Sequence, residues 1–216
     1  MSRLAALRSS WSSLRTRWRQ ATSPPPIKWT LFTLFWLPMG ICFTDMGYTV
    51  KTVTGRSMQP TLNPDSSTWR DVVLFDRWSI VVERKYNRGD IVALKSPYDA
   101  KLIVKRIIAL EGDKVKTLPP YPDAVVEVPE GHAWVEGDEP FKSEDSNHFG
   151  PVPLGLIESK LSAIIWPWSR RGYLNEPSLP DPQDQRSPAW RAQKAEFERA
   201  ARRRARVEYS GSSSSS

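Results

Sequence analysis

KLIVKRIIALEGD, residues 101–113, combines an apolar run with a closing Gly-Asp turn signal, which is the pattern of a β-strand. Alternate side chains of a strand share a face, so Ile103, Lys105 and Ile107 are expected to point the same way. Arg106 then points the other way. The pattern therefore predicts a lysine between two isoleucines, on a face that is expected to be packed.

Similar short apolar runs surround this strand. They are separated by Gly-Asp, Asn-Pro, Pro-Pro and Glu-Gly turn signals, and no long stretch of helical period interrupts them. We therefore predict one mostly β, antiparallel-sheet domain over residues 45–169. The expected strands include Tyr48–Val53, Val72–Phe75, Ile80–Val82, Ile91–Leu94, Leu102–Ile108, Ala124–Val128 and Ala133–Val135.

The run IKWTLFTLFWLPMGICFT, from Ile27 to Thr44, is apolar over 18 residues and carries a single charge, at Lys28. At about 1.5 Å per residue such a helix covers about 27 Å, enough for a bilayer core when its flanks reach the interface. A cleaved secretory signal is disfavoured because the basic region ahead of the run is too long. We predict one N-terminal transmembrane helix over residues 27–44.

Residues 1–26 are basic, rich in serine and free of acidic residues, as mitochondrial targeting segments are. The alternative is a cytosolic tail with positive charge next to the membrane. Residues 1–44 carry six Lys/Arg, and positively charged flanks stay on the negative side of a membrane. In the mitochondrial inner membrane that side is the matrix, so the body is expected in the intermembrane space.

The formal net charge of +7 resides on the two ends of the chain. Residues 45–169 hold 15 basic and 18 acidic residues, whereas a nucleic-acid groove needs its basic excess on the folded body. The pattern therefore argues against nucleic-acid binding. The single cysteine, Cys42, excludes an intrachain disulfide and a cysteine–histidine zinc site. His132 and His148 are the only imidazoles available for acid–base chemistry.

The C-terminal segment, residues 170–216, is polar. It contains a proline-rich stretch, then Ala189–Val207, dense in Arg, Ala and Glu, and finally GSSSSS. This composition is typical of a linker, a marginal helix and a flexible end, so we expect a largely disordered tail.

Ser57 lies in GRSMQPTLNP, residues 55–64, after a strand-like run and before a proline that blocks regular pairing. A serine at such a glycine-flanked strand exit can present its hydroxyl beside its own backbone N–H, as a nucleophile next to an oxyanion hole must. The alternative is a turn serine that bonds within its own loop.

Lys105 is a candidate base. Burial without a counter-charge disfavours the ammonium and lowers the pKa of a lysine, so that its neutral amine can accept a proton. Arginine keeps its proton in proteins, so Arg106 is unsuited to this role. The alternative is a lysine on an edge strand whose ammonium reaches the surface.

Four sequence blocks follow one another: GRSMQPTLNP (55–64), RGDIVALKSP (88–97), KLIVKRIIALEGD (101–113) and GHAWVEGDEPFKSEDSNHFGPVPLGLI (131–157). Together and in this order they resemble the type I signal peptidases, and in particular subunit 2 of the mitochondrial inner membrane protease. The resemblance spans residues 28–168, and several spaced blocks are highly specific. It implies a signal-peptidase-like catalytic domain and a serine endopeptidase that requires no metal or organic cofactor.

By this resemblance Ser57 is the nucleophile and Lys105 the general base. Ser143 matches the family serine that hydrogen-bonds the base lysine, an orienting role that triad enzymes also need. Asp145 matches the acid that braces the site, and Met58 resembles the residue beside the nucleophile that shapes the substrate pocket.

Two positions depart from the bacterial pattern. Many bacterial members have a serine two places before the nucleophile that helps to hold the oxyanion, and this chain has Gly55 there. The oxyanion hole must then depend on backbone N–H groups, including that of Ser57. Where bacterial members have an arginine two places after the bracing Asp145, this chain has Asn147, so no aspartate–arginine pair can form there.

The resemblance also implies partners: precursors with cleavable sorting signals, bound extended along a sheet edge, and a homologous subunit 1 in one membrane complex. Two other functions share parts of the pattern. A self-cleaving Ser–Lys peptidase would use the same pair without a membrane span. A catalytically silent, membrane-anchored β-domain would act only as a partner subunit. The complete set of Ser57, Lys105, Ser143 and Asp145 argues against the silent domain.

Overall fold

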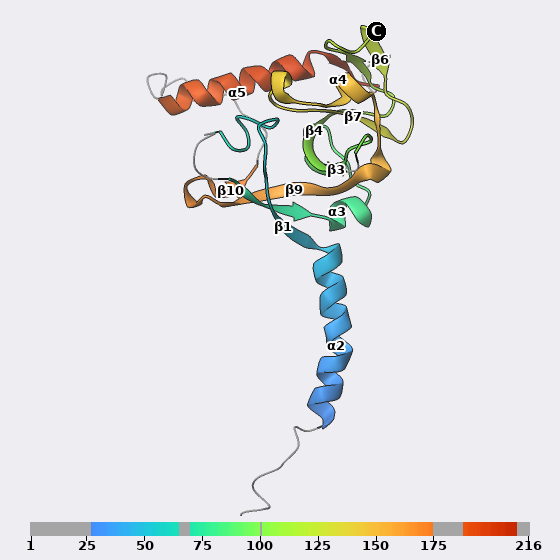
Figure 1. Ribbon diagram of the computed structural model, residues 1–216, viewed down its shortest axis with the longest axis vertical. Coiled ribbons are helices and arrows are strands. Elements are labelled where there is room, and N and C mark those ends of the chain that lie inside the picture. The colour runs from blue at the N-terminus through green and yellow to red at the C-terminus, as the bar shows by residue number, and fades with distance from the viewer. Residues whose placement is uncertain (1–26, 65–69, 100, 175–187, 211–216) are drawn as a thin grey trace, which may run out of the picture. The chain divides into compact units, whose positions relative to one another are not determined.

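The computed structural model describes residues 27–64, 70–99, 101–174 and 188–210 (Figure 1). The predicted targeting segment, residues 1–26, lies outside these residues. The chain divides into two compact units, Met1–Asp45 and Met46–Ser216, and each is described by itself.

A helix, α2 (Ile27–Met46), occupies the predicted apolar run, with Pro38 inside it. Large apolar residues lie on all sides of α2, and the described side chains from Trp29 to Met39 are exposed. Among the described residues, no helix combines the length and the hydropathy that a membrane crossing needs.

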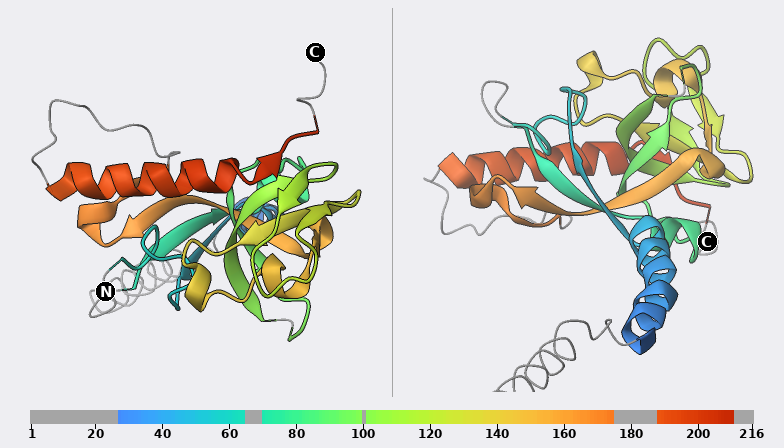
Figure 2. Two further views of the ribbon diagram at one scale, coloured as in Figure 1. Left: turned by 90° about the horizontal axis from the view of Figure 1, so that it is seen from above. Right: turned by 60° about the horizontal axis from the view of Figure 1, so that its bottom comes forward.

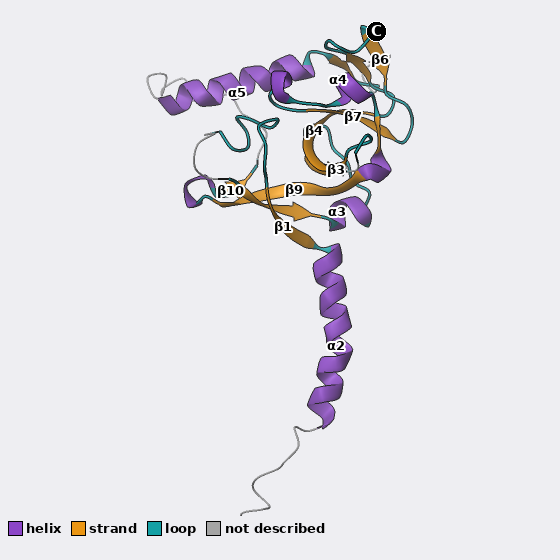
Figure 3. Ribbon diagram, in the orientation of Figure 1, coloured by secondary structure: helices purple, strands orange, loops and turns teal. Residues whose placement is uncertain are grey.

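Within the described residues, the body is built on an eight-stranded antiparallel sheet in the order β1-β2-β9-β3-β4-β7-β8, with β10 paired to β9 (Figure 3). A smaller antiparallel sheet has the order β11-β5-β6. The prediction of a mostly antiparallel β domain is confirmed. The strands are β1 (Tyr48–Thr52), β2 (Val72–Asp76), β3 (Ile91–Lys95), β4 (Leu102–Leu110), β5 (Lys114–Lys116), β6 (Val125–Glu127), β7 (His132–Glu136), β8 (Val152–Pro153), β9 (Ile157–Trp166), β10 (Gly172–Tyr173) and β11 (Val207–Glu208).

The predicted strand Ile80–Val82 is wrong. A single helical turn, α3 (Trp78–Val81), replaces it. Asp76, at the end of β2, favours this turn because its carboxylate accepts hydrogen bonds from Ser79 N (3.2 Å) and from Ser79 Oγ (2.6 Å). A local side-chain hydrogen bond therefore overrides the β propensity of the run.

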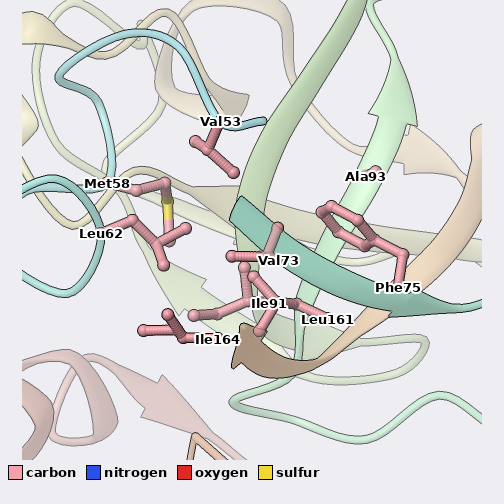
Figure 4. Packing of buried hydrophobic residues seen from close by; sticks show 9 residues of the cluster. All are labelled: Val53, Met58, Leu62, Val73, Phe75, Ile91, Ala93, Leu161 and Ile164. Atoms are coloured by element: carbon pink, nitrogen blue, oxygen red, sulfur yellow. The ribbon is translucent and has the colours of Figure 1, made fainter. Parts of the chain in front are cut away.

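Alternate residues of β3 pack in two different hydrophobic clusters. Ile91 and Ala93 belong to the first cluster, and Val92 and Leu94 belong to the second. The first cluster also takes in residues from the loop after β1, which is thereby fixed to the sheet. Figure 4 shows its members: Val53, Met58, Leu62, Val73, Phe75, Ile91, Ala93, Leu161 and Ile164.

The C-terminal segment differs from the expected disordered tail. It contains β10, a long helix α5 (Pro188–Arg204) and β11, and α5 lies against the body (Figure 2). β11 pairs with β5, and Val207 is buried in a third cluster with Trp134 and Val115. The expected helix within 189–207 exists, but its inner face packs on the body. Residues 175–187 and 211–216 lie outside the described residues.

Candidate active site

Lys105 lies in the middle of β4, opposite Val92 of β3. Ile103 and Ile107 pack in the same hydrophobic cluster as Val92, as the alternation predicted. The residue is only 3% exposed, although lysine is rarely buried without a paired charge. The alternative of a surface lysine on an edge strand is therefore wrong, because β4 is an interior strand between β3 and β7.

The Lys105 ammonium has a neutral partner. Nζ donates a hydrogen bond of 2.7 Å to Ser143 Oγ, and this serine is also buried. Burial lowers the pKa of Lys105 below its ordinary value, and the negative charges of Asp145 and Glu144 oppose this shift only in part. The environment thus favours the neutral amine that a base requires.

The loop that carries Ser57 is held at its far end by Asn63 and Asp71. Asn63 N donates to Asp71 Oδ2 (2.8 Å) and Asp71 N donates to Asn63 Oδ1 (2.7 Å). Arg170 adds an ion pair to Asp71 and a 2.6 Å hydrogen bond to the carbonyl oxygen of Thr61. Asn63 Nδ2 also donates to the carbonyl oxygens of Val53 (3.0 Å) and Gly55 (3.3 Å), so both ends of the loop are fixed and Ser57 is presented from a restrained backbone.

Gly137 is the point at which Ser57 and Ser143 meet. A Cβ built on Gly137 would lie 2.3 Å from Ser143 Oγ and 2.6 Å from the carbonyl oxygen of Ser57. That carbonyl also accepts a 3.0 Å hydrogen bond from Glu139 N. The structure therefore brings Ser57 and Ser143 together around one glycine, and Lys105 joins them through its hydrogen bond to Ser143.

Sequence reasoning missed Gly137. Glycine at this position reflects a close approach of side chain and backbone from two other segments, and not a turn conformation. The only signal available was its place in the block that contains Ser143, between a strand-like run and an acidic residue.

Asp145 supports this glycine. Its buried carboxylate accepts hydrogen bonds from Gly137 N (3.0 Å), from Asn147 N (3.1 Å) and from Asn147 Nδ2 (3.1 Å). Asp145 is thereby the N-cap of the short helix α4 (Ser146–Phe149). Asn147, which replaces the arginine of the bacterial pattern, further donates to Glu136 Oε1 (3.2 Å). An amide thus links two buried carboxylates where an ion pair was excluded.

Gly55 has a φ of +107°, a backbone region that residues with a side chain rarely adopt. A serine in this position would therefore strain the loop as it is folded here.

Met58 follows the nucleophile candidate and is 2% exposed, packed beside Val53 and Leu62. Its contacts anchor the loop in the core directly next to Ser57.

The described contacts of the two histidines do not include Lys105. His132 Nδ1 is 2.8 Å from the carbonyl oxygen of Glu130. His148 is partly exposed, and its Nδ1 is 4.0 Å from Asp145 Oδ1.

A cavity of about 690 Å³ lies between α5 and the strands β9 and β10, and neither Ser57 nor Lys105 lines it. Asp138, which follows Gly137, lines the cavity together with Arg106 and Arg203.

The sequence of the chain has clear relatives. The signal peptidase model of the peptidase S26 family matches residues 27–120. Subunit 2 of the mitochondrial inner membrane protease from Schizosaccharomyces pombe is 46% identical over 142 residues, covering 65% of this chain and 77% of that protein. The Danio rerio subunit 2 is 48% identical over 147 residues, covering 67% of this chain and 78% of that protein.

Two further matches are more distant. Subunit 1 of the mitochondrial inner membrane protease from Mus musculus is 40% identical over 128 residues, covering 57% of this chain and 72% of that protein. A crystal structure of a signal peptidase I from Enterococcus faecalis is 26% identical with a TM-score of 0.32, covering 36% of this chain and 97% of that one. On the identity and coverage of its subunit 2 relatives, the chain belongs to the signal peptidases of the peptidase S26 family, beside subunit 2 of the mitochondrial inner membrane protease.

Proposed function

We propose that this signal peptidase removes sorting sequences from precursors delivered to the mitochondrial intermembrane space, with Ser57 as nucleophile and Lys105 as general base. The observation that carries the proposal is a buried lysine whose partner is the neutral Ser143, joined to Ser57 around Gly137. The test compares precursor processing in mitochondria that carry the wild-type chain or Ser57→Ala.

The reaction follows from these groups. The neutral amine of Lys105 takes the proton of Ser57 as Oγ attacks the scissile carbonyl carbon. Backbone N–H groups, including that of Ser57, stabilise the oxyanion of the tetrahedral intermediate. Lys105 then returns the proton to the leaving amine as the C–N bond breaks. Water, deprotonated by the same lysine, hydrolyses the acyl-enzyme and releases Ser57.

Ser143 and Asp145 are proposed to position these groups. Ser143 holds the Lys105 amine at 2.7 Å, and Asp145 holds the N–H of Gly137 at 3.0 Å. Met58 is proposed to fix the depth of the substrate pocket from the core side. The relatives named subunit 1 and subunit 2 support a heterodimeric membrane complex, in which a homologous subunit 1 is the partner.

The acidic limb of kcat/KM is expected to report the titration of Lys105. Activity should fall as the pH drops through its lowered pKa, because the protonated amine cannot accept the serine proton. Ile103→Asn should admit water, weaken desolvation and move the limb to higher pH. Glu144→Gln removes a charge that raises this pKa, so the limb should move to lower pH.

These opposite shifts are measured as pH profiles of peptide cleavage by the purified protein. Lys105→Arg serves as the control, because arginine keeps its proton and should be inactive at every pH tested. A limb that stays in place in both variants would show that this lysine does not set the profile.

The single-pass topology is a further part of the proposal. It is supported by the exposed apolar side chains on all sides of α2 and by the basic residues that precede it. Carbonate extraction should leave the protein in the membrane pellet, and protease added after rupture of the outer membrane should digest the body. Release into the supernatant would contradict the span, and protection until the inner membrane is opened would reverse the orientation.

A further inference from the structure

The C-terminal arm, residues 188–210, comprises α5, the two-residue connection 205–206, β11 and the two residues that follow. The arm is attached to the body by the pairing of β11 with β5 and by a 3.0 Å hydrogen bond from Ser210 N to Asp113 Oδ1. The guanidinium of Arg88 also lies 5.0 Å from the ring centre of Tyr209. Together these contacts fix the end of α5 on the body.

Arg203, in the last turn of α5, reaches a buried carboxylate. Its NH1 atom lies 3.2 Å from Asp138 Oδ1, and the Asp138 side chain is only 1% exposed. Arg106 of β4 binds the same carboxylate at 2.9 and 2.7 Å. Burial alone would raise the pKa of Asp138, but Arg106 and Arg203 hold it below its usual value. The carboxylate is therefore charged and shared between the body and the arm.

Arg206 makes the matching contact on the other side of Gly137. It forms a two-point ion pair with Glu136, in which NH1 lies 3.1 Å from Oε1 and NH2 contacts Oε2. Glu136 is buried, and its Oε1 also accepts hydrogen bonds from Trp134 Nε1 (3.0 Å) and from Asn147 Nδ2 (3.2 Å). Asn147 in turn binds Asp145. A continuous chain of contacts thus links Arg206 to the carboxylate that holds Gly137.

Glu136 and Asp138 flank Gly137. Arg206 of the arm pairs with Glu136, and Arg203 of the arm shares Asp138 with Arg106 of the body. We propose that Arg203 and Arg206 are positioning residues, which hold the segment 136–138 in the geometry that brings Ser57 and Ser143 together. A buried carboxylate that loses its cation is strongly destabilised and moves towards water. Release of Arg206 would leave Glu136 without a cation, and release of Arg203 would leave buried Asp138 with Arg106 alone. Either change would shift the segment around Gly137, although neither arginine touches Ser57 or Lys105 in the described contacts.

This inference rests on the proposed function, because it assigns the arm a role in the same reaction. It also explains how the site works with Asn147 in place of an arginine. Position 147 carries no positive charge in this chain, and Arg206 supplies one to the network through its ion pair with Glu136. The composition of α5 indicates a marginal helix in a tail, whereas the proposal makes the arm that contains α5 part of the structure that holds the active site in place.

The test compares Arg203→Gln, Arg206→Gln and the double variant in the full-length protein, using cleavage of a precursor-derived peptide. Arg202→Gln is the matched control, since it removes the same charge from the same helix at a side chain that is 81% exposed, against 17% for Arg203 and 18% for Arg206. The double variant should lose about tenfold or more in kcat with KM within about twofold of wild type. The control should stay within about twofold in both.

The pH profile separates positioning from general destabilisation. Glu136 lies opposite Arg106, the neighbour of Lys105, in the pairing of β4 with β7. Without the arm arginines, the negative charges of Glu136 and Asp138 would be less compensated. This would favour the ammonium form of Lys105 and raise its pKa. The acidic limb should move to higher pH in the double variant and stay in place in Arg202→Gln. Arg206→Lys keeps the charge but not the two-point contact, and it should recover part of the lost kcat.

Losses no larger than those of Arg202→Gln, or a change in KM alone, would overturn the inference. If the double variant fails to fold by circular dichroism, Arg206→Lys and the two single variants decide by the same measures. Failure of the proposed function has a different signature: Ser57→Ala would then keep its cleavage, whatever the arm variants do.

Discussion

Replacement of Ser57 or Lys105 by alanine should abolish precursor cleavage while the protein still accumulates. Each variant is expected to lose about a thousandfold or more in kcat/KM, as when a nucleophile or its base is removed from other serine hydrolases. Ser57 lies on a loop restrained by Asp71 and Asn63, so loss of its hydroxyl removes the attacking atom without loosening the loop. Lys105→Ala removes the amine that donates a hydrogen bond of 2.7 Å to Ser143 Oγ.

The double variant Ser57→Ala/Lys105→Ala should lose little beyond either single change, because nucleophile and base act as a unit. His132→Ala and His148→Ala are the controls, and each should keep most of the activity. Cleavage is measured with a precursor in isolated mitochondria and with a peptide substrate. Residual activity within about tenfold of wild type in either alanine variant would contradict the dyad, and near-complete loss in one histidine variant would favour a histidine base.

The strand that carries Lys105 could be predicted because its evidence is local. The period of two over Ile103, Lys105 and Ile107 determines which side chains share a face, and a packed face follows from their hydrophobicity. The turn at α3 could not be predicted by the same rule, because the hydrogen bonds of Asp76 to Ser79 outweigh the β propensity of Ile80 and its neighbours.

The packing of the C-terminal arm could not be predicted for the opposite reason, since its stabilising contacts are distant in sequence. Arg206 and Glu136 are 70 residues apart, and no local pattern in either segment indicates that they meet. The composition of α5 predicts a polar helix with many exposed charges. The exposed side chains of Lys194 and Arg202 agree with this prediction. The partners of Arg203 and Arg206 are visible only once the sheet is folded.

In the site, too, some features could be predicted from the sequence and others depend on contacts between distant segments. Ser57, Lys105, Ser143 and Asp145 could be named from the resemblance, but the need for glycine at position 137 depends on two segments that approach it in space. Gly137 N–H is held by Asp145, and the space that a side chain would need is filled by Ser143 and by the backbone of Ser57. Gly137 therefore indicates, better than any motif does, that the segments carrying Ser57 and Ser143 lie close together.

Gly137→Ala should accordingly be among the most damaging substitutions that leave every proposed catalytic group in place. Its methyl group would lie 2.3 Å from Ser143 Oγ, 2.6 Å from Ser143 Cβ and 2.6 Å from the carbonyl oxygen of Ser57, so a backbone must move. Overpacking of this kind costs about 1–3 kcal/mol of stability. A shift of about 1 Å between reacting groups costs about a hundredfold in rate, which is the loss we expect in kcat/KM.

Gly155→Ala is the matched control, because a Cβ there meets nothing within 4 Å and its φ is not positive. This variant should keep full activity and gain about 0.4–1 kcal/mol of stability, since alanine restricts the unfolded chain more than glycine does. Thermal unfolding and peptide cleavage, measured on both variants, give the comparison. Wild-type activity in Gly137→Ala would mean that Ser57 and Ser143 need not meet around this glycine, and the close contact on which the proposed mechanism depends would then have no role in the reaction.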